Sequence, residues 1–200
     1  MGKASLSKVE QKAETRSRLR MAALTLFATH GYDDTPVSDI AALAGVSDRT
    51  FFLHFPTKAD AVMGIAPDRL LDALADRILG YEAGISDLEL LEDSLLSWLE
   101  GAGDRRVIHH RAQLVLRAAA LSPTVRGKQL EATDAMIVTA ATALARRRDL
   151  KNPNLEITVA ATVSIGLFDR ITAEWATRRP SDLRSIAKAH FQAFRAATTR

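Results

Sequence analysis

An arginine and two large apolar side chains share one face of a short helix that is predicted to follow Ser47. Ser47 is a good N-cap residue because its hydroxyl can accept a free backbone N–H. Arg49, Phe52 and Leu53 lie on the side of this helix opposite the inward-pointing Phe51. Such an outward face is typical of a helix that lies in a DNA major groove, with its N-terminal residues at base edges and its flanks against phosphates.

A second short helix precedes this one, and a glycine joins the two. Val37 and Ile40 recur at helical spacing and give the first helix an apolar face. Gly45 can adopt the left-handed backbone conformation of a tight turn, and Val46 supplies the apolar contact that closes it. The stretch 36–55 therefore predicts a helix-turn-helix. A plain helical hairpin that binds no DNA has the same pattern and is the alternative.

The residues around this pattern resemble the DNA-binding domain of TetR-type bacterial repressors. The resemblance covers residues 15–63, about a quarter of the chain. The matching pieces are Leu26-Phe27, Gly31-Tyr32, Thr35, Ile40-Ala41, Ala44-Gly45-Val46-Ser47, Thr50-Phe51, His54-Phe55-Pro56 and Lys58. The resemblance implies a three-helix DNA-binding head, a larger helical body and the function of a transcriptional regulator.

The resemblance also implies which side chains contact DNA. Arg49 is expected to read bases, and Thr50, His54 and Lys58 are expected to hold the phosphate backbone. The family usually has tyrosine at the position of Phe52, so we expect this ring to pack on a sugar or a thymine methyl instead. The complete predicted set is Thr35, Ser38, Ser47, Arg49, Thr50, Phe52, His54 and Lys58.

Helical periodicity continues through the remaining chain, so the predicted fold class is all-α. Residues 1–13 carry no periodic apolar set and are expected to form a flexible arm. The head is expected over 14–64, and Pro67 interrupts the helical pattern after it. A helical ligand-binding and dimerisation body is expected over 65–200.

Local cations, rather than the overall charge, favour a nucleic-acid partner. The net charge of the 200 residues is only +3. A group of cations precedes and enters the first predicted helix: Lys8, Lys12, Arg16, Arg18 and Arg20. This group would place positive charge beside DNA phosphates. A solvated tail that keeps the protein soluble is the alternative.

The sequence lacks the residue sets that enzymes and metal sites use. It has no cysteine, no glycine-rich phosphate loop and no HExxH pair. His109 and His110 are neighbours, so on a helix they point about 100° apart and do not converge on a metal. We expect no catalytic residue, no metal and no cofactor.

No segment predicts a membrane protein. The first twelve residues lack the apolar core of a signal peptide. The longest uncharged apolar run, 157–168, is shorter than the roughly 20 residues that a bilayer requires. A cytoplasmic bacterial location is expected, at the nucleoid when the protein is bound to DNA.

The last two predicted helices are candidates for a dimer interface. The first of them is apolar nearly all round from Ile157 to Phe168 and must be buried on several sides. The second is amphipathic. Two such helices make half of a four-helix bundle, and a second copy could supply the other half. We therefore expect a homodimer through 154–198. A monomer that buries both helices in its own core is the alternative.

An apolar or amphipathic small-molecule effector in the body is implied by the resemblance. The candidate pocket residues are Trp98, Gln113, Arg117, Thr133, Met136 and Phe168, and core packing is the alternative role of each. The expected function is that of a repressor that binds an inverted-repeat operator as a homodimer and is released by this ligand. The alternative function is a ligand-independent, dimeric DNA-binding adaptor.

Overall fold

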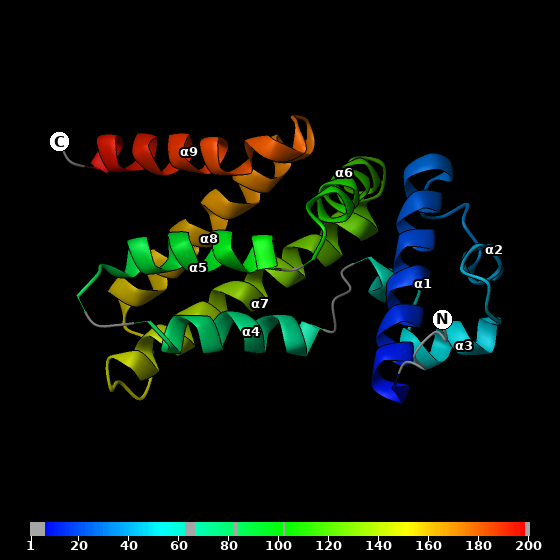
Figure 1. The fold of residues 1–200 in the computed structure, drawn as a ribbon, viewed down its shortest axis with the longest axis horizontal. Helices are drawn as coiled ribbons and strands as arrows, with labels where there is room; N and C mark the ends of the chain where they lie inside the picture. Colours follow the sequence, from blue (N-terminus) through cyan, green and yellow to red (C-terminus); the bar gives the residue numbers. More distant parts are fainter. Residues whose placement is uncertain (1–6, 63–66, 82–83, 102, 199–200) are drawn as a thin grey trace, which may run out of the picture. The chain divides into compact units, whose positions relative to one another are not determined.

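The computed structural model describes residues 7–62, 67–81, 84–101 and 103–198, and within them every regular element is helical, which confirms the all-α prediction (Figure 1). The α-helices are α1 (Lys8–His30), α2 (Val37–Leu43), α3 (Asp48–His54), α4 (Pro67–Leu79), α5 (Asp87–Gly101), α6 (Arg105–Leu121), α7 (Pro123–Arg147), α8 (Leu155–Ala176) and α9 (Leu183–Thr198). Two 3-10 turns, η1 (Ala59–Ala61) and η2 (Pro180–Asp182), precede α4 and α9.

The chain divides into two compact units. The first consists of Met1–Ile65 together with Leu114–Gln129, and the second consists of Ala66–Gln113 together with Leu130–Arg200. Both α6 and α7 therefore contribute residues to each unit. A stretch within the expected body, 114–129, packs with the head.

Helix α1 begins earlier than the expected arm allows. The Ser7 hydroxyl accepts the N–H of Glu10 at 3.3 Å, and the Glu10 carboxylate accepts the N–H of Ser7 at 2.7 Å. This capping box satisfies two backbone donors and starts the helix at Lys8. Residues 8–13 of the expected flexible arm are thus helical, and residues 1–6 lie outside the described part of the chain.

The core of the first unit holds α1, α2 and α3 together. Its largest members, Phe27, Phe51 and Phe55, are completely buried. Residues from α6 and α7, Leu114 and Val125 among them, belong to the same core. The predicted turn between α2 and α3 is confirmed: Gly45 has a φ of 69°, and the N–H of Val46 returns to the carbonyl of Ala41 at 2.9 Å.

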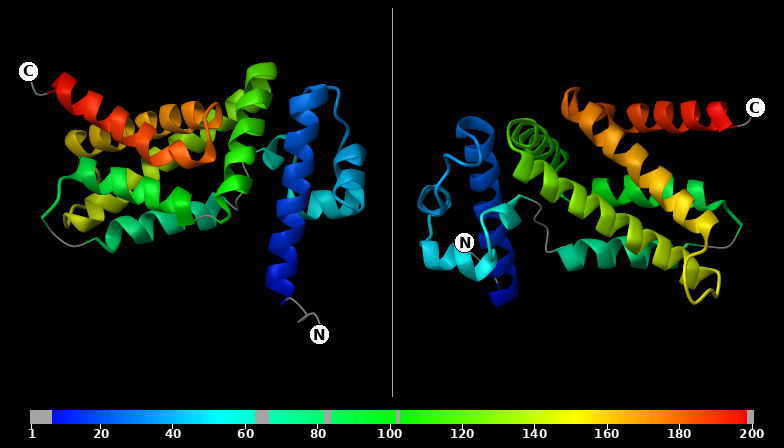
Figure 2. Two further views of the ribbon diagram at one scale, coloured as in Figure 1. Left: turned by 45° about the horizontal axis from the view of Figure 1, so that its top comes forward. Right: turned by 180° about the vertical axis from the view of Figure 1, so that it is seen from behind.

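The second unit is a bundle in which α5 packs against α4, α8 and α9, and α8 packs against α9 (Figure 2). Its core includes Leu95, Leu144, Ile165 and Phe191, all fully or almost fully buried. The largest buried side chain is Trp175, whose ring meets that of His109 at 4.8 Å between centroids. The Nε2 atom of His109 also lies 2.9 Å from the carbonyl oxygen of Trp175. His109 is therefore a packed core residue.

The candidate nucleic-acid interface

Helix α3 has one buried face and one exposed face, as the sequence pattern predicts. Phe51 is completely buried, whereas Phe52 and Leu53 remain 54% and 71% exposed. Arg49 is exposed, and no described residue forms a hydrogen bond or an ion pair with it. Ser47 caps the helix by accepting the N–H of Thr50 at 3.2 Å. The guanidinium of Arg49 and the two apolar side chains therefore lie on a helix whose N-terminus is fixed by the Ser47 cap.

Arginines of α1 help to hold α3 in place. The Nη1 group of Arg16 donates to the carbonyl oxygen of His54, and the guanidinium carbon lies 4.2 Å from the centroid of the Phe55 ring. Arg20 is also buried, at 4% exposure. These two members of the predicted cation group are part of the packing of the head. Lys8, Lys12 and Arg18 stay exposed.

The ammonium group of Lys58 is engaged inside the head rather than extended into solvent. It donates to the carbonyl oxygens of Tyr32 at 2.6 Å and of Thr35 at 2.9 Å, and it lies over the Tyr32 ring. Lys58 thereby joins the turn after α3 to the loop between α1 and α2. Because an ammonium has three N–H donors, one donor is left for the phosphate contact predicted from the sequence.

Thr35 does not fit its predicted role as a DNA contact. Its side chain is buried at 2% exposure, and its hydroxyl donates to the carbonyl oxygen of Gly31 at 2.6 Å. Pro36 occupies the N-cap position of α2, and no side chain of the described residues caps this helix. The hydroxyl hydrogen is bonded to the carbonyl at the end of α1, so this buried side chain has no free O–H to offer a phosphate.

His54 is half-buried at the end of α3. Desolvation lowers its pKa below the usual 6.5, and the positive charges of Arg16 and Lys12 lower it further. Its Nδ1 atom is buried and has no hydrogen-bond partner among the described residues. The imidazole is therefore neutral near pH 7, and a contact with phosphate would use a neutral N–H group rather than a cation.

The remaining predicted DNA-binding residues are accessible to different degrees. Ser38, at the start of α2, and Ser47 are exposed, and Thr50 is half-buried with its hydroxyl 3.0 Å from that of Ser47. The sequence-based set omits Leu53. Its position four residues after Arg49, on the same face of the helix, is the signal that could have included it.

The candidate ligand residues are only partly brought together. The rings of Trp98 and Phe168 meet at 6.0 Å between centroids, and Met136 packs against the same core. The Thr133 hydroxyl donates to Asp169 at 2.8 Å. Gln113 is half-buried in the second unit, whereas Arg117 is exposed and belongs to the first unit. Arg117 does not join the other five residues in one unit.

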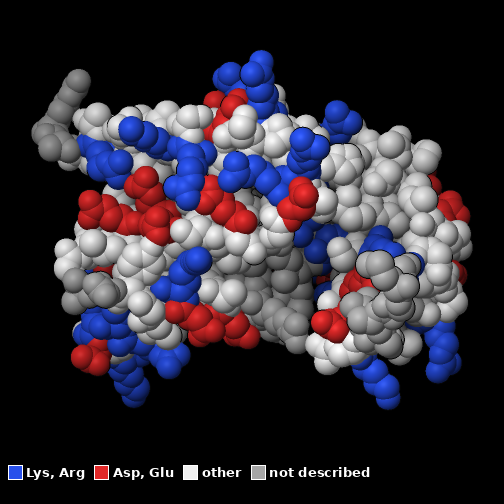
Figure 3. All heavy atoms as spheres, in the orientation of Figure 1, with Lys and Arg blue, Asp and Glu red and all other residues white. Residues whose placement is uncertain are grey.

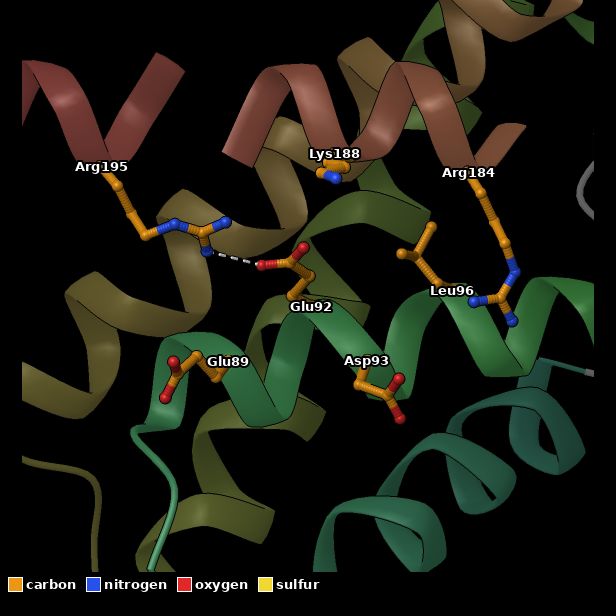
Figure 4. A pocket seen from close by; sticks show the side chains of 7 residues that line it. All are labelled: Glu89, Glu92, Asp93, Leu96, Arg184, Lys188 and Arg195. Atoms are coloured by element: carbon orange, nitrogen blue, oxygen red, sulfur yellow. Dashed lines mark hydrogen bonds and ion pairs between the residues drawn. The ribbon is translucent and has the colours of Figure 1, made fainter. Parts of the chain in front are cut away.

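A pocket of about 690 Å³ opens elsewhere in the second unit, between α5 and α9 (Figure 4). Acidic side chains along α5 face basic ones along α9, and the two rows are visible on the surface (Figure 3). Arg195 bridges them through its 2.8 Å contact with Glu92. None of the six ligand candidates lines this pocket.

Among the described residues, no three side chains of metal-ligating type gather closely enough to hold a metal ion. None of their helices qualifies as a membrane-spanning segment.

Residues 19–61 match the family model of bacterial regulatory proteins of the tetR family. This N-terminal stretch is similar to the tetR family. The match covers the C-terminal part of α1 together with α2, α3 and η1, and α3 presents Arg49 and Phe52 on the surface of the head. No curated protein matches the chain.

Solved structures share the fold of this chain over most of its length. The fatty acid degradation regulator FadR from Bacillus halodurans has a TM-score of 0.57 and 18% identity, over 94% of this chain and 96% of its own. Thermus thermophilus FadR, a TetR-family repressor in complex with lauroyl-CoA, has a TM-score of 0.53 and 22% identity, over 88% and 91%. NalD, the secondary repressor of the MexAB-OprM multidrug efflux pump in Pseudomonas aeruginosa, has a TM-score of 0.52 and 20% identity, over 92% and 96%.

Proposed function

We propose that this chain is a transcriptional repressor without enzymatic activity, which binds an inverted-repeat operator as a homodimer and is released by a small apolar or amphipathic ligand. The observation that carries the proposal is the exposed face of α3. An unpaired Arg49 and two large apolar side chains on a tightly packed TetR head have no role in the core. They match the base edges of a major groove, where arginine pairs with guanine and apolar groups contact thymine.

An open apolar stripe on α8 supports the proposed homodimer through 154–198. Leu155 and Val159 are 79% and 51% exposed, and Thr162 and Gly166 continue the same face at helical spacing. Apart from the nearby backbone of α8 itself, no atom of the described residues lies within 4 Å of the point where a Cβ atom of Gly166 would stand, so a second helix has room to approach there. The opposite side of α8 already packs on α5 and α9. A second copy related by a two-fold axis would cover the stripe.

The dimer determines the form of the operator. Two α3 helices related by a two-fold axis would enter successive major grooves about 34 Å apart on one side of the duplex. Each half-site would then present the same bases to the same face of α3. The operator is accordingly an inverted repeat with half-site centres roughly 10 base pairs apart.

The proposed ligand binds in the second unit. Trp98 and Met136 are only partly buried and can rearrange around an apolar molecule, since methionine adapts its shape readily. Thermus thermophilus FadR, a structure of the same fold, binds lauroyl-CoA. Release of DNA requires that the ligand favour the non-binding conformation, and a coupling of about 1–3 kcal/mol is usual.

A ligand-independent DNA-binding adaptor is the second candidate function. Phe168 is 5% exposed and Trp98 packs on it, so these candidate pocket residues fill space in the core. The two candidates differ in one measurement. A ligand that lowers operator affinity supports the repressor, whereas one that raises the melting temperature without changing operator affinity supports the adaptor.

The test of DNA binding is selection of duplexes from a random pool by the full-length chain, followed by native mass spectrometry of the complex. We expect an enriched inverted repeat and two chains per duplex. A pool that shows no enrichment contradicts the proposed function. A single chain that protects one asymmetric site contradicts the dimer.

A further inference from the structure

Leu53 is the most exposed large apolar side chain of α3, and packing within the head does not explain this exposure. Its exposure is 71%, compared with complete burial for Phe51 two residues earlier. A leucine at a free surface contributes little to folding, because burial from water is the source of its stabilisation. Its neighbours on the same face are Arg49, four residues earlier, and Phe52. Leu53 is therefore part of a mixed face with one cation and two apolar groups.

The chemistry of this face restricts what it can recognise. In the major groove the base edges carry hydrogen-bonding groups, and the apolar group among them is the C5-methyl of thymine. An isobutyl side chain neither donates nor accepts a hydrogen bond, so a hydrogen-bonding edge opposite Leu53 would lose its water without compensation. The C5-methyl group of a thymine opposite Leu53 is instead removed from water favourably.

We propose that Leu53 reads the C5-methyl group of a thymine in each operator half-site, next to a guanine read by Arg49. The inference rests on the proposed DNA binding and adds to it the identity of the bases. Phe52 extends the apolar surface toward the neighbouring nucleotide, and Arg49 supplies the hydrogen bonds of this face. A half-site that is read this way contains at least one T·A pair that is recognised by its methyl group rather than by its hydrogen-bonding pattern.

The experiment removes the methyl groups from the DNA one at a time. Each thymine of the selected operator is replaced by uracil, which keeps the base pair and lacks only the C5-methyl. We expect the full-length chain to lose about fourfold in affinity at one or more thymines in each half-site, the value of one buried methyl-sized group. Uracil elsewhere in the duplex has no effect.

Leu53→Ala then assigns the contact to a residue. This variant binds the thymine and uracil operators equally at the position that Leu53 reads. The matched control is Leu130→Ala on α7, which removes another leucine that is 58% exposed. That control retains the uracil sensitivity of the unmodified chain. Phe52→Ala identifies any thymine that the ring contacts instead.

The possible outcomes separate this inference from the proposed function. If duplexes are selected but no uracil changes affinity by more than about twofold, the methyl-reading role is wrong and DNA binding stands. If the sensitivity persists unchanged in Leu53→Ala, Leu53 is not the reader. If no duplex is selected at all, the proposed function and this inference both fail.

Discussion

The ammonium of Lys58 lies 4.2 Å from the centroid of the Tyr32 ring and donates a 2.6 Å hydrogen bond to the carbonyl oxygen of the same residue. A second bond from the ammonium reaches Thr35. These contacts connect the loop between α1 and α2 with the turn that follows α3. Lys58 therefore positions the two short helices of the head relative to each other.

Replacing Lys58 should destabilise the head. In Lys58→Met the apolar stem is retained and the two charge-assisted bonds and the cation–π contact are lost. We expect a loss of about 1–3 kcal/mol in the free energy of unfolding, measured by urea denaturation. The control is Lys12→Met on the exposed surface of α1, which should leave stability unchanged. Equal stability of both variants would show that Lys58 has no positioning role.

Thr35 should affect stability and not DNA affinity. Thr35→Val keeps the branched shape but removes the hydroxyl that donates to the Gly31 carbonyl, which leaves that oxygen without this bond. We expect a loss of about 1 kcal/mol in unfolding free energy and unchanged operator affinity at temperatures where the head is folded. If Thr35→Val has normal stability and weakened DNA binding, Thr35 contacts DNA as the sequence predicts.

His54 should make the head less stable as the pH falls. Its pKa in the folded chain is below the ordinary 6.5, so the unfolded chain takes up a proton first. The resulting loss of unfolding free energy is absent above about pH 6.5, grows as the pH falls toward the folded pKa and is constant below it. Urea denaturation between pH 5 and 7.5 should show a steeper dependence for the unmodified chain than for His54→Gln. Parallel curves would contradict this effect.

Asp169 should affect the pH dependence of stability in the opposite direction to His54. Burial raises the pKa of the Asp169 carboxyl, and the hydrogen bond from the Thr133 hydroxyl lowers that pKa by a smaller amount. The charged form of Asp169 therefore opposes folding. The penalty is complete above the folded pKa and disappears as the pH falls from there toward the ordinary value near 3.8. Asp169→Asn keeps an oxygen that accepts the Thr133 hydroxyl, and it should melt at a higher temperature than the unmodified chain at pH 7. A lower melting temperature at pH 7 would mean that the carboxylate has a favourable partner.

The sequence predicts the features of the head that depend on near neighbours. The glycine turn at Gly45, the Ser47 cap and the two faces of α3 are each determined within a few residues, and each is confirmed. The start of α1 also depends on near neighbours, through the capping box of Ser7 and Glu10. The periodicity argument missed it because it counts apolar residues, and this first turn has few.

The features that the sequence does not predict depend on residues far apart in the chain. Lys58 donates to a carbonyl 26 residues away, and Arg16 donates to one 38 residues away. Backbone carbonyls leave no mark in the residue pattern, so both cations were assigned to DNA. The contribution of 114–129 to the head likewise depends on tertiary packing rather than on local periodicity.

Fluorescence anisotropy with the selected operator and a scrambled duplex tests most directly whether the exposed face of α3 reads DNA. The unmodified chain should bind the operator more tightly than the scrambled duplex. Arg49→Ala should lose about 1–3 kcal/mol on the operator alone, with unchanged stability and unchanged affinity for the scrambled duplex. Equal losses on both duplexes, or no preference for the operator by the unmodified chain, would contradict the account.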